Sequence, residues 1–270
     1  MNKKFNVYIM GDIHGSVHPI KEFIRRNKDK QFDSTDVLIL LGDSGLNYHL
    51  DERDYFFKKA LCKLPFTYFV IRGNHEERPS ICMQNNPDKW EWSEFFGGSV
   101  FQEKEFPQIK YANDMPESYF IPKGDGTYYS TLVFPGAYSV DKFYRLMNKW
   151  NWFENEQLSP EEMDWGKCIV KFREEWDLVL SHTCPIIYEP TDLFLPTIDQ
   201  STVDKTMERF FGEIEYSTNY KLWCFGHYHS TRVYPLQNGT SQPLMLYNDK
   251  VINLDEWMEA ISHKSIGQFL

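Results

Sequence analysis

The chain has 270 residues, of which 41% are hydrophobic and 25% charged, and its formal net charge is −10 at pH 7. This is the composition of a folded globular protein and excludes an intrinsically disordered chain. The acidic excess disfavours binding to long nucleic acid or to an anionic membrane, whose phosphates would be repelled. No apolar run approaches the roughly 20 residues of a membrane span. The five cysteines form no C-x-x-C pair, so we expect neither a disulfide framework nor a structural zinc site, and we expect a cytoplasmic protein.

Six short runs are rich in Val, Ile, Leu and aromatic residues and end abruptly in Gly, Asn, Asp, Ser or His. Each predicts a buried strand followed by a tight loop, and together they cover residues 5–12, 36–43, 66–74, 130–139, 177–183 and 221–227. Helical spacing and helix-start residues predict helices over 18–28, 51–64 and 159–176. Strands that alternate with helices indicate an α/β fold.

The pattern changes between residues 106 and 139, where short apolar runs predict an antiparallel meander with a turn at 123–126. The sheet is therefore expected to be mixed. No repeat or flexible linker marks a boundary, so we expect a single domain over 1–270, with insertions near 80–100 and 143–176 that flank the functional site.

Five polar signatures follow five of the predicted strands. They are GDIHG, GDSG, GNHE, SH and GHYH, and they contain Asp12, His14, Asp43, Asn74, His75, His182, His227 and His229. In α/β sheets the carboxyl ends of the strands meet at one edge, where ligands bind. Carboxylate, amide and imidazole groups without thiolates suit Mn²⁺, Fe or Zn²⁺, and the number of ligands fits two ions better than one.

Each signature taken alone has a plainer interpretation as a turn with a solvated side chain. His182 is the weakest of the expected ligands, because a single histidine after a strand is more often a hydrogen-bonded core or surface residue. His18, His49 and His263 match no motif and are interpreted as surface residues.

Two further groups of residues could contribute to a substrate site. Tyr138, Asp141 and Arg145 lie in the loop after a predicted strand and either line the substrate pocket or are ordinary polar loop residues. Trp90, Trp92, Trp150 and Trp152 could stack on nucleobases, but packing in the core or in a lid is the preferred interpretation.

In their order along the chain, the five signatures resemble those of the calcineurin-like metallophosphoesterases over residues 11–229. The resemblance implies a four-layer α/β sandwich, in which two mixed β-sheets are flanked by helices. It implies that Asp12, His14, Asp43 and His229 hold one metal ion, and that Asp43, Asn74, His182 and His227 hold a second. It assigns His75 to the substrate phosphate, as the proton donor to the leaving oxygen rather than as a ligand.

One departure bears on the substrate. The serine/threonine protein phosphatases of this superfamily carry G-D-x-V-D-R-G as the second motif, whereas this chain reads GDSGLNY and lacks the phosphate-binding arginine there. The segment GAYSVDKFYR instead is similar to a loop of bacterial and phage-type members.

The resemblance thus implies a phosphoester hydrolase with two divalent ions, Mn²⁺ first and Fe, Zn²⁺, Co²⁺ or Mg²⁺ as alternatives. A metal-bridging hydroxide would attack phosphorus in line. The expected substrate is a small phosphomonoester, a phosphodiester or a dinucleoside polyphosphate, with nucleotides among the candidates. The alternatives are a protein phosphatase-like enzyme and a non-catalytic scaffold.

Overall fold

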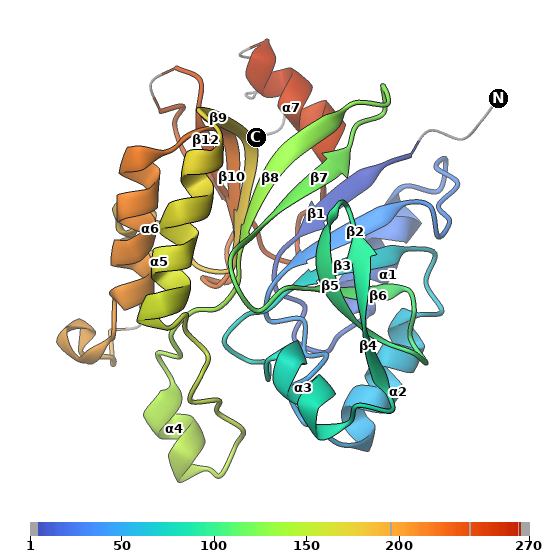
Figure 1. Ribbon diagram of the computed structural model, residues 1–270, viewed down its shortest axis with the longest axis vertical. Helices are drawn as coiled ribbons and strands as arrows, with labels where there is room; N and C mark the ends of the chain where they lie inside the picture. The colour runs from blue at the N-terminus through green and yellow to red at the C-terminus, as the bar shows by residue number, and fades with distance from the viewer. Residues whose placement is uncertain (1–4, 195, 238, 264, 266–270) are drawn as a thin grey trace.

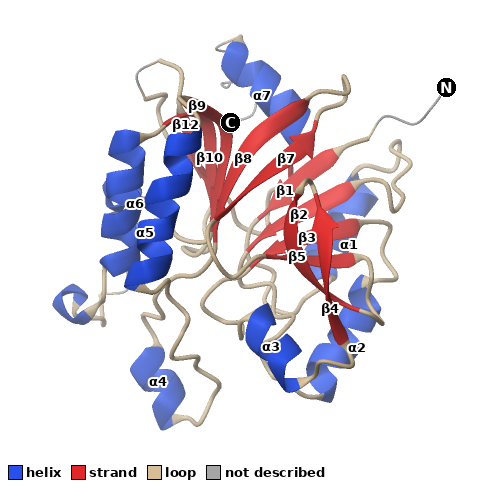
Figure 2. Cartoon of the chain, viewed as in Figure 1, coloured by secondary structure: helices blue, strands red, loops and turns tan. Residues whose placement is uncertain are grey.

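Two β-sheets pack face to face and carry helices on their outer faces (Figures 1 and 2). The computed structural model describes residues 5–194, 196–237, 239–263 and 265. Both sheets contain parallel and antiparallel neighbours, which confirms the predicted four-layer sandwich of two mixed sheets flanked by helices.

The first sheet has the strand order β13-β1-β2-β3-β6-β5-β4. These strands are β13 (Ile252–Asn253), β1 (Val7–Met10), β2 (Val37–Leu41), β3 (Thr67–Ile71), β6 (Ile109–Ala112), β5 (Gly98–Glu103) and β4 (Trp90–Phe95). The strands from β1 to β6 in this order run parallel, and the outer pairs are antiparallel. The loops after β1, β2 and β3 therefore leave the same edge of the sheet.

The second sheet has the order β11-β12-β10-β9-β8-β7. Its strands are β11 (Arg232–Val233), β12 (Gln242–Met245), β10 (Asn219–Phe225), β9 (Glu175–Ser181), β8 (Tyr128–Phe134) and β7 (Glu117–Pro122). The four central strands are parallel. Their carboxyl ends, and above all those of β9 and β10, complete the site described below.

Strand β2 illustrates why the apolar runs are continuous rather than alternating. Ile39 and Leu41 belong to the core between the two sheets, together with Leu178 of β9. Leu38 and Leu40 face the other way, into a second core that also includes residues of the helices on the outer face. Because successive side chains point to opposite faces, a strand buried on both sides must be apolar throughout.

The helices divide between the two outer faces. The first sheet is covered by α1 (His18–Arg26), α2 (Glu52–Leu61) and α3 (Pro79–Asn85), and the second by α5 (Pro160–Ile169) and α6 (Thr206–Ser217). Residues of α7 (Leu254–Ser262) join the core between the sheets. The short helix α4 (Lys142–Met147) lies apart from these layers, at the lower left in Figure 1.

Three local predictions were wrong. The expected meander breaks after β6, which pairs in parallel with β3 in the first sheet; only β7 and β8 form a hairpin, with the predicted turn at 123–126. The predicted helix over 159–176 ends at Ile169 and gives way to strand β9 at Glu175. Arg145 lies on α4 rather than in a loop.

The two stretches expected as insertions form regular structure. Residues 80–100 contain most of α3 and strand β4, which extends the first sheet, and residues 143–176 contain most of α4 and the whole of α5. Their status as insertions stays a prediction. Among the described helices, none has both the length and the apolar character that crossing a bilayer requires.

Candidate metal centre

The carboxyl ends of five strands bring all seven expected ligands to one edge of the sandwich. Loops after β1, β2 and β3 supply Asp12, His14, Asp43 and Asn74, and loops after β9 and β10 supply His182, His227 and His229. Residues from positions 12 to 229 thus meet at the place where the two sheets face each other. That they bind metal stays a prediction from the sequence, to which the geometry below adds.

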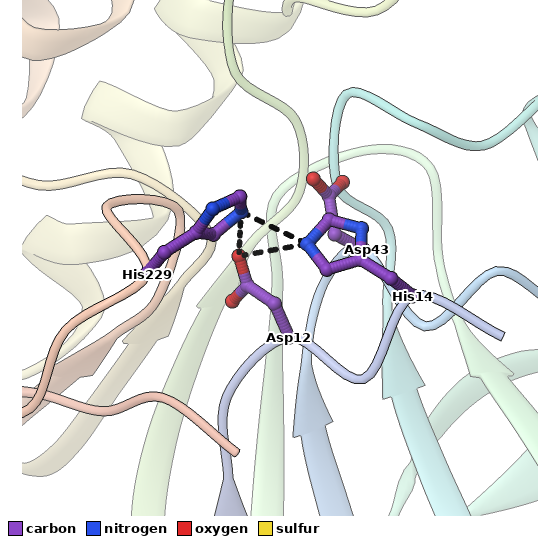
Figure 3. A group of neighbouring side chains, drawn as sticks. All are labelled: Asp12, His14, Asp43 and His229. Atoms are coloured by element: carbon purple, nitrogen blue, oxygen red, sulfur yellow. Dashed lines mark hydrogen bonds and ion pairs between the residues drawn. The ribbon is translucent and has the colours of Figure 1, made fainter. Parts of the chain in front are cut away.

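A first cluster consists of Asp12, His14, Asp43 and His229, each with one ligand atom within 4.8 Å of the others (Figure 3). Nε2 of His14 lies 2.9 Å from Nε2 of His229, and the latter lies 3.6 Å from Oδ2 of Asp12. Four groups that can each offer a lone pair therefore converge on one point. This is the donor set that a divalent cation with mixed nitrogen and oxygen ligands requires.

A second cluster shares Asp43 with the first. Nε2 of His182 lies 3.3 Å from Oδ1 of Asp43 and 3.0 Å from Oδ1 of Asn74. The ring of His227 lies 5.0 Å from that of His182, centroid to centroid. These residues thus lie together, with Asp43 next to both clusters, and their role as the second ligand set stays a prediction.

His182, the weakest ligand in the sequence, has the clearest geometry. Its Nδ1 lies 2.6 Å from the backbone carbonyl oxygen of Leu41, to which it donates its proton. Its Nε2 atom faces the oxygens of Asp43 and Asn74. Against the effect of burial, Asp43 raises the pKa of His182 to about 9, so in the absence of metal Nε2 carries a proton. A metal ion bound here would replace that proton and take the lone pair of Nε2. A second hydrogen bond that fixes the tautomer and the ring orientation in this way is usual for metal-binding histidines. The oxygens of Asp43 and Asn74 thus surround a position where a metal ion would replace the proton on Nε2 of His182.

Glycines next to the ligands allow this close approach. Gly42 has φ +91°, and a Cβ atom there would lie 2.2 Å from Nδ1 of His182. A Cβ atom on Gly226 would lie 2.3 Å from Oδ1 of Asp12. Space thus favours glycine at both positions, and at Gly42 the backbone conformation favours it as well.

Backbone strain is concentrated at the centre. Four of the seven non-glycine residues with positive φ in the described chain are His14 (43°), Asp43 (44°), His227 (72°) and His229 (52°). Such conformations cost free energy and persist where function or surrounding structure imposes them. In each case they turn the chain sharply at a residue expected to bind metal.

The two buried aspartates differ in their electrostatics. Burial raises the pKa of Asp12 to about 7, although His182 favours its charged form. Burial would also raise the pKa of Asp43, but His75 and His182 outweigh it and hold this pKa well below its usual range. Two carboxylates with no exposed surface need compensating positive charge, which metal ions would supply.

His75 stands beside the centre rather than within either cluster. Its backbone N–H donates to Oδ1 of Asp43 over 3.0 Å, and its Nε2 lies 3.5 Å from Oδ2 of the same residue. Nε2 also contacts Nη2 of Arg145. Burial and the neighbouring Arg145 lower the pKa of His75 to about 4, against the opposing charge of Asp43.

Arg145 supplies a guanidinium where the second motif offers none. It is 1% exposed, its Nε donates to Oδ1 of Asp141 over 2.8 Å, and its Nη1 is buried without a hydrogen-bond partner among the described residues. Of the three expected substrate residues, Asp141 and Arg145 thus form a pair beside His75. Tyr138 lies in the wall of an adjacent cavity.

Two cavities open from the centre on different sides of His75 and Asp141, which line both. One, of about 360 Å³, is lined by polar and aromatic residues: His14, Tyr48, His49, Arg53, Phe57, Arg145 and Trp150 among them. The other, of about 390 Å³, reaches from Asn74 and His227 to a mostly apolar wall that includes Tyr138, Val140, Leu193, Phe194, Ile198 and Val203. The centre is therefore accessible from two chemically different sides.

Several residues at the site differ from their expected surroundings. His49, interpreted as a surface residue, is half-buried in the wall of the first cavity, whereas His18 and His263 are exposed as predicted. Trp150 lines the same cavity, while Trp90 packs in the core and Trp92 packs on Phe101.

Two buried residues behind Asn74 were not identified from the sequence. Ser139 accepts a hydrogen bond from Nδ2 of Asn74, and Glu156 binds Ser139. Ser139 stands at the end of a predicted strand, as the expected ligands do, and this position could have indicated that it belongs to the site. Nothing in the sequence distinguishes Glu156 from other acidic loop residues.

The chain was compared with known protein families, sequences and structures. The family model described as calcineurin-like phosphoesterase matches residues 5–231. No curated protein sequence matches the chain. Among solved structures, the protein TT1561 of Thermus thermophilus is 12% identical, with 96% of each chain covered and a TM-score of 0.53. A phosphopantetheinyl hydrolase from Mycobacterium tuberculosis is 14% identical, with 90% of each chain covered and a TM-score of 0.44.

The family model spans most of the chain and includes every motif residue described above. This family implies metal-dependent phosphoester hydrolysis. The chain belongs to the calcineurin-like phosphoesterase family.

Proposed function

We propose that this protein hydrolyses small phosphoesters with two divalent metal ions. One ion would be held by Asp12, His14, Asp43 and His229, and the other by Asp43, Asn74, His182 and His227. The observation that carries the proposal is the pair of ligand sets that share Asp43. The mixed nitrogen and oxygen donors suit Mn²⁺, Fe, Co²⁺ and Zn²⁺ better than the hard ion Mg²⁺, and the choice of Mn²⁺ as the first candidate follows the family resemblance and not the donor set.

Such a metal pair supplies a water of lowered pKa and neutralises charge on the phosphoryl oxygens. The protein must then bind the phosphoryl group and protonate the leaving oxygen. We assign the first task to Arg145, whose buried Nη1 donor has no partner in the described chain. The second task falls to His75, which contacts Arg145 and lies outside both ligand sets.

The contact between Arg145 and His75 couples these tasks. While Nη2 of Arg145 donates to Nε2 of His75, that nitrogen carries no proton. A phosphoryl anion beside them would attract the guanidinium away from the ring and raise the pKa of His75 by its own negative charge. Substrate binding would thereby prepare the general acid.

The two cavities favour a phosphodiester over a phosphomonoester. A monoester has one organic group and would leave one cavity without a substrate group, whereas a diester or a dinucleoside polyphosphate has a group for each side. Arg53 and Trp150 on one side suit an anionic or aromatic group, and Leu193, Phe194 and Val203 on the other suit an apolar one.

We further propose a cytoplasmic setting, because all five cysteines are free thiols.

The test combines metal analysis with hydrolysis on one purified preparation. The substrates are p-nitrophenyl phosphate, bis-p-nitrophenyl phosphate, a cyclic nucleotide and a dinucleoside tetraphosphate, each with and without added Mn²⁺. We expect about two ions per chain and metal-dependent turnover that is faster on the diesters. Full metal loading with no turnover of any substrate would support a scaffold role, and turnover of the monoester alone would remove the diester assignment. Release of phosphate from a phosphoserine peptide at a higher rate would support the phosphatase-like alternative.

A further inference from the structure

The side-chain amide of Asn74 has two ends of similar shape, and only its oxygen can bind a metal ion. In the structure Nδ2 of Asn74 donates to Oγ of Ser139 over 3.0 Å, and Oδ1 lies 3.0 Å from Nε2 of His182. The amide oxygen therefore points toward the second ligand set. A rotation of 180° about the last side-chain bond would present the NH₂ group instead, which has no lone pair for a cation.

Two buried groups determine which end points to the ligands. Ser139 has no exposed surface, and Glu156 is 2% exposed. Oε1 of Glu156 accepts the backbone N–H of Ser139 over 2.8 Å, and Oε2 lies 2.5 Å from Oγ of Ser139. Because a carboxylate can only accept, the single hydroxyl proton of Ser139 is committed to Glu156. Oγ of Ser139 can then only accept, and the side-chain donor that the described residues place against it is the NH₂ group of Asn74.

We propose that Ser139 and Glu156 are positioning residues that hold the oxygen of Asn74 toward the second metal ion. This inference rests on the proposed function, since it assumes that Asn74 binds an ion. Neither residue touches the ligand sets except through Asn74 in the described contacts. Their effect is on orientation. Glu156 accepts the hydroxyl proton of Ser139, so the oxygen of this hydroxyl group can accept only from the NH₂ end of the Asn74 amide.

The loop that carries Asn74 also holds Glu156 in place. Nη1 of Arg72 donates to the backbone carbonyl oxygen of Glu156 over 2.7 Å. Arg78 donates from Nε to the carbonyl of Asn155 over 2.9 Å and from Nη2 to that of Gln157 over 2.8 Å. Arginines on both sides of the GNHE motif thus bind three consecutive carbonyl groups. Segment 155–157 is therefore fixed relative to Asn74, as an orienting group must be.

The sharpest variant is Glu156→Gln, which keeps size and shape and replaces one acceptor by a donor. The glutamine NH₂ group would donate to Oγ of Ser139, whose own proton would then turn toward residue 74 and favour the flipped amide of Asn74. We expect Mn²⁺ titration calorimetry of the metal-free protein to show a second-site affinity about 10- to 100-fold weaker, the usual cost of losing an outer-shell partner. The first-site affinity should stay unchanged, and the electron paramagnetic resonance signal of a coupled Mn²⁺ pair should weaken.

A second substitution separates orientation from simple disruption. Aspartate at position 74 has an oxygen at both ends, so it cannot be flipped into a non-ligand. In the native chain Asn74→Asp places that second oxygen against Oγ of Ser139, which has no proton to give, and should weaken the second site. In the Glu156→Gln chain the hydroxyl proton is free to donate, so Asn74→Asp should restore second-site binding. The coupling between the two substitutions is therefore expected to be favourable.

The outcomes are distinguishable. Native second-site affinity in Glu156→Gln, or an Asn74→Asp/Glu156→Gln double variant with the summed losses of both singles, would overturn the positioning roles. If Glu156→Gln does not fold, as judged by its thermal unfolding, Ser139→Ala gives the same test, because loss of the acceptor should lower second-site affinity while native affinity there would refute the role. A native protein that binds no Mn²⁺ at either site would refute the proposed function itself.

Discussion

Arg145 of α4 contacts Nε2 of His75 across 70 positions of sequence, and it lies almost completely buried beside the metal centre. This guanidinium stands near the ligands although the second motif, where the protein phosphatases carry their arginine, has none. The structure therefore places a buried guanidinium from another part of the chain beside these residues. The substrate contact itself is our proposal.

Replacement of Arg145 by Gln should raise the KM for p-nitrophenyl phosphate by about 10- to 100-fold, the value of a charge-assisted hydrogen bond. Arg145→Lys should recover only part of this loss, because a lysine lacks the planar fork. Metal content should remain native in both variants. Arg25→Gln on the exposed face of α1 is the matched control. An unchanged KM in Arg145→Gln would remove the phosphate-binding role.

Removal of the imidazole in His75→Ala should lower kcat by about 10²- to 10⁴-fold, as expected for loss of a general acid. Both metal ions should remain bound, because His75 lies outside the two ligand sets. Asp43→Ala should lose activity and both ions together, since Asp43 is common to the sets. Kinetics and metal analysis of the two variants separate the roles, and normal turnover of an alkyl phosphate by His75→Ala would contradict the assignment.

Gly42→Ala tests whether close approach maintains the second site. The new methyl group would lie 2.2 Å from Nδ1 of His182 and should displace this ring. We expect loss of one ion per chain. Gly126→Ala in the β7–β8 turn is the control, because Gly126 has a similar φ of +87° but has no atom within 4 Å of the added Cβ. Backbone strain is thus common to both variants, and metal loss should occur only in the first.

Val203→Trp tests the apolar cavity. A larger side chain in this wall should raise the KM for bis-p-nitrophenyl phosphate by more than that for p-nitrophenyl phosphate, because only the diester has a second aryl group. The ratio of the two KM values is the measurement. Equal changes in the two KM values would show that the cavity admits both substrates to the centre and does not bind the second aryl group of the diester.

We expect the buried carboxyl group of Glu208 on α6 to make the free energy of unfolding depend on pH. Burial raises its pKa from 4.5 to about 7, and its Oε2 has no hydrogen-bond partner among the described residues. The folded protein thus binds this proton more tightly than the unfolded chain does, so the free energy of unfolding should fall as pH rises from about 4.5 to about 7 and then level off. This fall in the free energy of unfolding amounts to up to about 3 kcal/mol above pH 7, and it should be absent in Glu208→Gln.

Denaturant unfolding of the metal-free protein at pH 5 and pH 8 measures this effect. The free energy of unfolding of Glu208→Gln, relative to that of the native chain, should be higher at pH 8 than at pH 5. Glu213→Gln, at an exposed position of the same helix, serves as the control. A difference that is the same at both pH values would show that the carboxyl of Glu208 is not the group responsible.

The sequence was most informative where a strand ends in a polar motif. Asp12, Asp43 and Asn74 follow apolar runs that could hardly be anything but buried strands, and parallel strands bring their carboxyl ends together by geometry alone. The pairing of β6 was not predictable in this way. Its short run over 109–112 is compatible with either sheet, and only packing in three dimensions assigns it to β3.

Arg145 and Glu156, which lie outside the two ligand sets, were difficult to predict from the sequence for a related reason. From the sequence alone, Arg145 either lines the substrate pocket or is an ordinary polar loop residue. Its burial was not predictable, because it depends on a helix of six residues with little pattern of its own. Glu156 has no sequence signal at all, since its role depends on hydrogen bonds to a serine 17 positions away and to Arg72 of another loop. A sequence motif predicts the local turn that carries a ligand, whereas the positions of Arg145 and Glu156 depend on how distant segments pack in the whole fold.

The expected ligands come from both sheets, four from loops of the first and three from loops of the second. On the proposed function, ions that bind only when the sheets are docked add their binding free energy to the stability of the folded chain, about 2.7 kcal/mol for a site at a hundred times its Kd. Each ion would then act as a cross-link between the two halves of the sandwich. The metal supply of the cell would set the lifetime of the folded protein as well as its rate of turnover.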